Sequence, residues 1–297
     1  MIAAAARNGG NGTARPLDPA LVRRAARAAL DEDLGERGDV TGELALPAAR
    51  HVTAVIVARA ELVQAGLPVA REVFALLDPA IEFEPAREDG SRLGRGATVA
   101  SLRGAARPIL AGERTALNFL MRMSGIATAT AAAVEEIAGS GTRILDTRKT
   151  APGLRVLDKY AVSCGGGCNH RMGLHDAVLI KDTHRAAGCS IAEAVREARL
   201  RGHEPGRITV EVRDLAELAE AIAAGAARVL LDNMDVAAVR SAVRAAAGRV
   251  TLEASGGLRP GKLREMAETG VDFLSLGWLT HSAPAADLAL EVRAWSS

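Results

Sequence analysis

The stretch SCGGGCNHR, residues 163–171, combines groups that could do several kinds of chemistry. Cys164, Cys168 and His170, with His175 close behind, could be zinc ligands, although C-x3-C-x-H is not the spacing of a common zinc site. A thiolate nucleophile is a second alternative, because nearby cations lower the pKa of a thiol. We favour a third, in which both cysteines are free, reduced thiols that pack as small side chains.

Cationic side chains surround this stretch. The chain has 37 basic residues but only four lysines, three of which lie between residues 149 and 181. Lysine is a compact point charge and arginine a planar fork, so a lysine in an arginine-rich chain is a candidate functional residue. The cationic candidates are Arg148, Lys149, His170, Arg171 and Lys181. Together they would suit a ligand with several negative charges, such as phosphates and carboxylates; the alternative is ordinary surface residues.

Two acidic residues, Glu211 and Asp232, are further candidates for the site, because each lies near the end of an apolar run that could be a strand. Two carboxylates at neighbouring strand ends could hold Mg²⁺, with water and ligand phosphates completing the shell. They could also bind ribose hydroxyls, or form salt bridges to the cations. The residues alone leave these three alternatives open.

A glycine-rich pair of segments, EASGG and SLGW, completes the set of candidates. The loops after the last strands of a β/α barrel often bind phosphate through backbone N–H groups. Glycine lets the backbone approach such a ligand closely. The candidates are Ser255, Gly256, Gly257 and Gly277. The alternative is two ordinary turns between a strand and a helix.

The elements that must position these residues form a series in the second half of the chain. Six apolar runs, which we interpret as strands without alternation and buried on both faces, are each followed by a helical segment. They span 143–149, 177–182, 208–213, 228–233, 250–257 and 273–278. Nearly every run ends in a polar residue or glycine, and the carboxyl ends of parallel strands meet at one mouth. The pattern predicts an incomplete α/β barrel of six or seven strands.

The first half of the chain mixes helices and strands without strict alternation, which is typical of an α+β domain. Asp18 is the expected N-cap of a helix over 17–34. A long helical region over 107–139 is expected to break or bend near Ser124 and Gly125. The other expected elements are a helix at 67–77 and strands at 51–60 and 97–104.

Composition excludes several classes of protein. The net charge of +1 does not favour a polyanion-binding surface. Aromatic residues make up only 2% of the chain, which disfavours a base-stacking nucleic-acid module. No apolar run is long enough to cross a membrane, and the start of the chain does not have the pattern of a signal peptide. With three cysteines, these features favour a reducing compartment, the cytoplasm.

Long motifs along the chain resemble those of the quinolinate phosphoribosyltransferase family. They include ERTALNFLMRMSGIAT, ILDTRKTAPGLRVLDKYAVSCGGGCNHRMGLHDAVLIKDTH, LLDNM, LEASGG and LGWLTHSAPAADLAL. The resemblance runs from about residue 38 to residue 290. It implies an N-terminal α/β sandwich domain followed by the incomplete barrel. On this basis we expect a flexible tail at 1–16, a sandwich domain at 17–122 joined by 283–297, and a catalytic barrel at 123–282.

The resemblance also implies an activity. Members of this family transfer the phosphoribosyl group of PRPP to the ring nitrogen of quinolinate, with Mg²⁺, and release pyrophosphate and CO₂. The product is nicotinate mononucleotide, an intermediate of NAD biosynthesis. The family works as a homodimer with the active site at the subunit interface. Rival interpretations are a phosphoribosyltransferase with another acceptor, such as nicotinate, and a non-catalytic phosphometabolite-binding or metal-sensing protein.

Residue roles follow from the resemblance, position by position. Binders of the two quinolinate carboxylates would be Arg114, Arg148, His170 and Arg171, with Arg114 supplied by the partner subunit. Lys149 and Lys181 would be shared between quinolinate and PRPP, and Glu211 and Asp232 would lie near the ribose and Mg²⁺, directly or through water. The phosphate would meet Ser255, Gly256, Gly257 and Gly277. Departures from the family pattern are Thr183 in place of asparagine, Arg213 in place of an acid and His175 in place of an aromatic residue.

Overall fold

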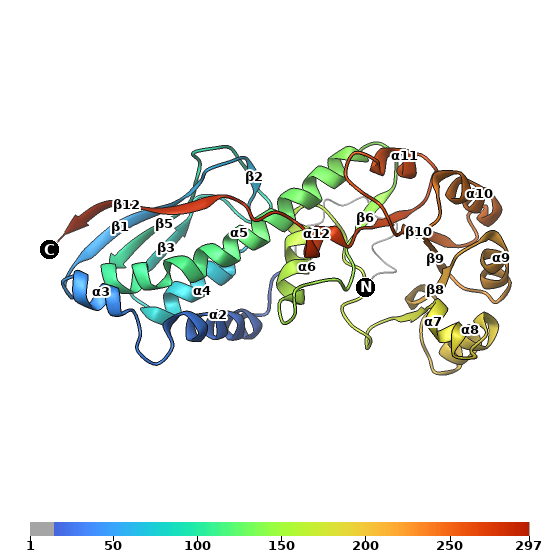
Figure 1. Cartoon of the computed structure of the whole chain (residues 1–297), viewed down its shortest axis with the longest axis horizontal. Helices are drawn as coiled ribbons and strands as arrows, with labels where there is room; N and C mark the ends of the chain where they lie inside the picture. The colour runs from blue at the N-terminus through green and yellow to red at the C-terminus, as the bar shows by residue number, and fades with distance from the viewer. Residues whose placement is uncertain (1–14, 297) are drawn as a thin grey trace. The chain divides into compact units, whose positions relative to one another are not determined.

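A computed structural model describes residues 15–296, which form two compact units (Figure 1). The sheet unit contains the described chain up to Ala131, Ala151–Gly166 and the chain from Ser282. The barrel unit contains Ala132–Thr150 and Gly167–His281. The predicted boundary between residues 122 and 123 falls inside a helix that runs through both units, and the predicted tail, 1–16, lies almost entirely outside the described residues.

The sheet unit is built on a four-stranded antiparallel sheet with the order β12-β1-β5-β3. Its strands are β1 (His51–Ala58), β3 (Glu82–Pro85), β5 (Thr98–Ala105) and β12 (Leu288–Ser296). A short ladder joins β2 (Leu62–Val63) to β4 (Arg92–Leu93). Helices α2, α4 and the first part of α5 lie along one side of the four-stranded sheet (Figure 1).

The helices of this unit are α2 (Pro19–Leu34), α3 (Val40–Ala45), α4 (Leu67–Leu77), α5 (Ala106–Glu136) and α6 (Arg155–Cys164). Asp18 caps α2 as predicted, because its carboxylate accepts a hydrogen bond from the N–H of Ala20 at 2.9 Å. The predicted break near Ser124 and Gly125 is wrong, because α5 runs through both residues without interruption, while a bend there stays a prediction. Gly125 serves another purpose: a Cβ there would collide with the carbonyl oxygen of Pro284, so glycine lets the C-terminal segment pass close to the helix.

The barrel unit is built on six parallel strands in the order β6-β11-β10-β9-β8-β7. The strands are β6 (Arg143–Leu145), β7 (Val178–Ile180), β8 (Ile208–Val212), β9 (Arg228–Asp232), β10 (Thr251–Ser255) and β11 (Phe273–Ser275). Within the described residues no ladder joins β7 back to β6, so the barrel is incomplete and has the smaller of the two predicted strand numbers.

Helical segments follow the strands of the barrel unit. They are α7 (Asp182–Ala186), α8 (Ile191–Leu200), the 3-10 turn η1 (Pro205–Arg207), α9 (Leu215–Ala223), α10 (Val236–Ala246), α11 (Leu263–Ala267) and α12 (Trp278–His281). Figure 1 shows α8, α9 and α10 outside the strands. No helix among residues 15–296 is long and apolar enough to cross a membrane.

The two faces of the parallel sheet differ in chemistry, which corrects our interpretation of the strands as apolar without alternation. Burial was predicted correctly for β8, every residue of which is buried, whereas Val178 and Leu179 of β7 are only half-buried. The register nevertheless puts polar side chains in rows on one face, because residues i and i+2 share a face and paired residues are level. The register pairs Glu211 with Leu230, Leu230 with Glu253, and Glu253 with Phe273; the next level pairs Asp232 with Ser255 and Ser255 with Ser275. The opposite face is apolar and carries buried side chains such as Val210, Val229 and Leu252.

Candidate active site

The segment 169–171 is fixed to the end of β6 by a buried carboxylate. Asp146 is fully buried and accepts hydrogen bonds from Asn169 Nδ2 at 2.7 Å and from the backbone N–H of His170 at 2.8 Å. Cys168 lies alongside β6, where its N–H donates to Ile144 at 2.8 Å. These contacts place His170 and Arg171 at the carboxyl end of the first strand.

Arg171 is a buried cation next to another cation. Only 6% of the residue is exposed, and its Nη1 donates to the carbonyl oxygen of Ala177 at 3.0 Å. Its Nε is buried and has no hydrogen-bond partner among the described residues. Burial, and then the positive charge of Arg148, lower the pKa of the Arg171 guanidinium. A donor in this condition is suited to an anionic ligand.

Lys149 lies over the backbone that follows β11. Its carbonyl oxygen accepts from Thr280 Oγ1 at 2.8 Å, and its N–H donates to Thr147 Oγ1 at 3.0 Å. A Cβ placed on Gly277 would come within 2.9 Å of Lys149 Cδ and 3.3 Å of His281 Nε2. The structure thus brings the predicted lysine and one predicted phosphate-binding glycine together.

Lys181 and Glu211 form an ion pair at the ends of β7 and β8, with 2.8 Å between Nζ and Oε2. The Glu211 side chain is 7% exposed and that of Lys181 is 41% exposed. By the register, Glu211 and Asp232 lie on one face of the sheet, about 7 Å apart along the strands. Of the three alternatives for Glu211, a salt bridge is therefore present, and it leaves Asp232 on the same face for a second role.

The predicted phosphate loop begins beside Asp232. The N–H of Asn233 donates to the carbonyl of Ser255 at 2.8 Å, and Asn233 Nδ2 donates to Asp232 Oδ2 at 2.9 Å. Gly256 and Gly257 have φ values of +95° and +66°, which favour glycine. A Cβ on Gly256 would also collide with the side chain of Asn233. These contacts hold the loop directly after β10.

Arg114 belongs to the sheet unit, whereas the other predicted site residues belong to the barrel unit. It lies on α5 and is exposed. Of the three residues at which the sequence departs from the family pattern, two contact Asp182 and the third lies beside its own loop. Arg213 Nη1 lies 3.8 Å from Asp182 Oδ2, the N–H of Thr183 donates to Asp182 Oδ1 at 2.7 Å, and the ring of His175 lies beside Gly173.

Two buried charges lie at the centre of the barrel unit: Arg228, which sequence reasoning missed, and Glu253, which it noted only as a polar strand end without a role. Both lie on the polar face, with 3.6 Å between Arg228 Nη2 and Glu253 Oε2. The signal was the alternation of polar with apolar residues over 251–255, TLEAS, and the charges at the two ends of 228–232, RVLLD, both of which we treated as uniform apolar runs. Asp146, which anchors 169–171, was noted only as a polar strand end.

The cysteines are free thiols, and Cys164 and Cys168 belong to different units. Burial and the nearby charge of Asp89 raise the pKa of Cys164 to about 12. Burial raises the pKa of Cys168 as well, although its Sγ accepts from Arg143 Nη2 at 2.7 Å. In residues 15–296, no three His, Cys, Asp or Glu side chains are placed to hold a metal ion together.

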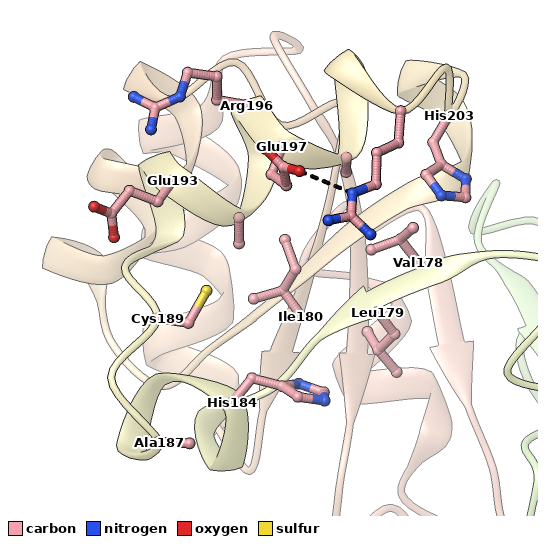
Figure 2. Close-up of a pocket in the computed structure, with 13 residues that line it drawn as sticks. Val178, Leu179, Ile180, His184, Ala187, Cys189, Glu193, Arg196, Glu197 and His203 are labelled. Atoms are coloured by element: carbon pink, nitrogen blue, oxygen red, sulfur yellow. Dashed lines mark hydrogen bonds and ion pairs between the residues drawn. The ribbon is translucent and has the colours of Figure 1, made fainter.

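A hollow of about 670 Å³ lies beside β7 (Figure 2). Its floor is Val178, Leu179 and Ile180, and α7 and α8 form its walls. The ion pair drawn there joins Glu197 of α8 to Arg201, the residue that follows this helix, at 2.8 Å. None of the predicted catalytic or substrate-binding residues lines this hollow, although His184 in its lining accepts a hydrogen bond from the N–H of Lys181 at 2.9 Å.

Comparisons with known proteins agree with the geometry. Residues 39–124 and 126–291 match the N-terminal and C-terminal domains described as quinolinate phosphoribosyl transferase. A probable nicotinate-nucleotide pyrophosphorylase (carboxylating) of Bacillus subtilis is 42% identical over 88% of this chain and 90% of its own length. The nicotinate-nucleotide pyrophosphorylase (carboxylating) of Mycobacterium leprae is 42% identical over 91% and 97%. The solved nicotinate-nucleotide pyrophosphorylase of Francisella tularensis is 40% identical, with a TM-score of 0.89 over 95% of this chain and 99% of that one.

Proposed function

Because the chain belongs to the quinolinate phosphoribosyl transferase family, we propose that it joins quinolinate to the phosphoribosyl group of PRPP. Pyrophosphate and CO₂ leave, and nicotinate mononucleotide is formed for NAD biosynthesis. The single observation that carries this proposal is the polar face of the barrel unit. The Lys181–Glu211 pair and Asp232 lie at the ends of strands on this face, and Arg171, whose Nε is buried and has no hydrogen-bond partner among the described residues, belongs to the segment fixed to the end of β6.

Quinolinate carries two carboxylates, and the cations of the site suit them. Arg148, His170 and Arg171 are the proposed binders in the barrel unit, and Arg114 is the proposed fourth. A guanidinium pairs with a carboxylate through two parallel hydrogen bonds, which fixes the orientation of the pyridine ring. The buried Nε of Arg171 would gain a partner when the substrate binds.

Transfer begins at the anomeric carbon of PRPP, where the bond to pyrophosphate breaks and the pyridine nitrogen attacks. Positive charge builds on the ribose as the leaving oxygen departs. Glu211 and Asp232 stabilise that charge electrostatically, and they also suit the ribose hydroxyls. Lys181, held 2.8 Å from Glu211, keeps a compact positive charge beside the departing phosphates.

The loops after β10 and β11 are the proposed phosphate cradle. Ser255, Gly256 and Gly257 follow β10, and Gly277 follows β11. Lys149, whose side chain lies over Gly277, neutralises phosphate charge at this point.

Magnesium fits the donors that are present. Glu211 and Asp232 offer oxygen ligands on one face of the sheet, which suits Mg²⁺ bound by one or two carboxylates together with water and substrate phosphates. When bound, Mg²⁺ neutralises the leaving pyrophosphate. We propose that these two residues hold it, directly or through water.

Loss of CO₂ follows from the same bond formation. Once the ring nitrogen is alkylated it is cationic, so the electron pair left at C2 when the C2–carboxylate bond breaks is stabilised by the adjacent charge. A proton then replaces the carboxylate at C2. The protein's part is to hold this carboxylate where water is scarce, and the buried side of the Arg171 segment suits that role.

We propose that the enzyme works as a homodimer or a higher oligomer, in which Arg114 of one subunit completes the site of its partner. The exposure of Arg114 on α5 supports this role. Mixing inactive Arg114→Ala and Lys149→Ala proteins tests it. In a symmetric dimer, random exchange restores about a quarter of the wild-type activity, because one site in each mixed dimer is intact. No recovery after subunit exchange would show that Arg114 acts within its own subunit.

We also propose a cytoplasmic location, which the three free thiols support, because unpaired cysteines are typical of a reducing compartment.

The deciding experiment is an assay with purified protein, PRPP and Mg²⁺, offered either quinolinate or nicotinate. We expect nicotinate mononucleotide from quinolinate, with one CO₂ released for each molecule formed. Consumption of nicotinate with quinolinate left untouched would overturn the proposal.

A further inference from the structure

Glu253, which the proposed mechanism does not use, lies at the centre of the barrel unit. The residue is 1% exposed. Its Oε1 accepts from the hydroxyl of Ser275, and its Oε2 lies 3.6 Å from Arg228 Nη2 but has no hydrogen-bond partner within residues 15–296. The Arg228 guanidinium also lies 5.1 Å from the ring centre of Phe273. Burying a carboxylate with an unbonded oxygen costs free energy, so its retention calls for a reason.

The neighbouring imidazole gives that reason. The backbone N–H of Arg171 donates to His170 Nδ1 at 2.6 Å. A ring nitrogen that accepts a hydrogen bond carries no proton, so the neutral ring is protonated on Nε2. His170 Nε2 lies 3.5 Å from Glu253 Oε1. Negative charge at that distance favours the tautomer with its proton on Nε2.

We propose that Glu253 is a positioning residue that acts through His170 on Arg171. Its charge holds His170 as the Nε2–H tautomer, which leaves Nδ1 able to accept the Arg171 N–H. The bond to Nδ1 and the bond from the His170 N–H to Asp146 then fix the backbone that carries the Arg171 guanidinium. This inference rests on the proposed function, in which Arg171 binds a quinolinate carboxylate. Both ring nitrogens of His170 then face protein groups, so this inference replaces the direct contact of His170 with a quinolinate carboxylate, proposed above, by an indirect one through Arg171.

The first test reads the tautomer directly and needs no activity. Nitrogen-15 spectra of the six histidines in the full-length protein, with His170 assigned through a His170→Asn variant, should show the Nε2–H tautomer at neutral pH. In Glu253→Gln, which keeps the shape but removes the charge, the Nδ1–H tautomer should become populated. An Nδ1–H signal in the wild type, or an unchanged His170 signal in Glu253→Gln, would overturn the proposal.

The second test is kinetic. Because Arg171 contacts one substrate, Glu253→Gln should raise KM for quinolinate about tenfold and change KM for PRPP less than about twofold. Glu253→Asp keeps the charge but moves it back by one methylene, so its KM for quinolinate should lie between those of Glu253→Gln and the wild type. This variant replaces Glu253→Gln in the test if Glu253→Gln does not fold. Equal changes in both KM values would indicate a merely structural role and refute the proposal.

A matched control is Glu265→Gln on α11, an exposed glutamate in the same unit, which should change neither readout. Failure of the proposed function is distinguishable from failure of this inference. A wild-type protein that does not consume quinolinate would overturn the function, while the tautomer of His170 would still decide whether Glu253 controls it.

Discussion

Gly277→Ala offers a direct test of how Lys149 is positioned. Gly277 does not have a left-handed backbone, so alanine is compatible with its φ. The added Cβ would lie 2.9 Å from Lys149 Cδ, whereas carbon atoms normally approach to about 3.5–4.0 Å. The lysine must therefore retreat by about 1 Å, and a misplacement of this size costs about 100-fold in rate.

The effect should appear in activity and not in stability. Lys149 is exposed and flexible, so its displacement should cost less than about 0.5 kcal/mol, or about 2 °C in Tm. The assay is kcat/KM for PRPP, from the rate of nicotinate mononucleotide formation, together with a thermal melt. Gly94→Ala is the matched control, because Gly94 also lacks a left-handed backbone and has nothing within 4 Å of its Cβ position. If Gly277→Ala kept more than half of the wild-type kcat/KM while Lys149→Ala was inactive, the placement of Lys149 over Gly277 would be irrelevant to catalysis.

Three further perturbations test the site and its scaffold. Lys181→Ala and Glu211→Gln should each lower kcat by about 100-fold or more. Because the two residues act as a unit, the double variant should have nearly the same kcat as the less active single variant. A double-mutant cycle in which the two losses multiply would contradict this. Arg122 donates two hydrogen bonds to the buried carboxylate of Asp158, at 2.8 and 2.7 Å. Asp158→Ala should therefore lower the free energy of unfolding by about 3 kcal/mol and Tm, measured by calorimetry, by roughly 6–12 °C. An unchanged Tm would refute this expectation. Burial raises the pKa of Cys164 to about 12, so the thiolate fraction at pH 8 should be about a thousandfold smaller than in free cysteine. The rate of Cys164 alkylation, measured by peptide mass spectrometry, should therefore keep rising with pH beyond 10. The stability linked to this raised pKa is complete below about pH 8.5 and is lost as pH rises towards 12, and an alkylation plateau near pH 9 would show that the thiol is not buried as described.

Features that depend on a few adjacent residues could be predicted from the sequence. The cap at Asp18 was predictable because capping depends on a few adjacent residues. The six strands of the barrel unit were predictable because each apolar run is followed by its own helix. Lys149 and Lys181 were found because lysine is rare in this chain, and the resemblance then gave them roles.

Features that depend on distant contacts escaped prediction. Residues 155–164 follow β6 in sequence, yet α6 belongs to the sheet unit, where Arg122 bonds Asp158 and Tyr160 donates to Asp89 at 2.9 Å. The sequence pattern of α6 alone does not predict these contacts. Glu253 escaped because its meaning depends on His170, some eighty residues earlier, and on a register that places it level with Leu230 and Phe273.

The position of β12 has a consequence for the order in which the molecule can fold. β12 pairs along the whole of β1, from Ala58 with Leu288 to His51 with Ser296. Until residues 288–296 leave the ribosome, one edge of β1 has no neighbour, and by then the whole barrel unit has been synthesised. An unpaired strand edge is a site at which chains associate wrongly. Newly made chains should therefore depend on chaperones during this interval, and a chain shortened before residue 288 should aggregate even though its barrel sequence is complete.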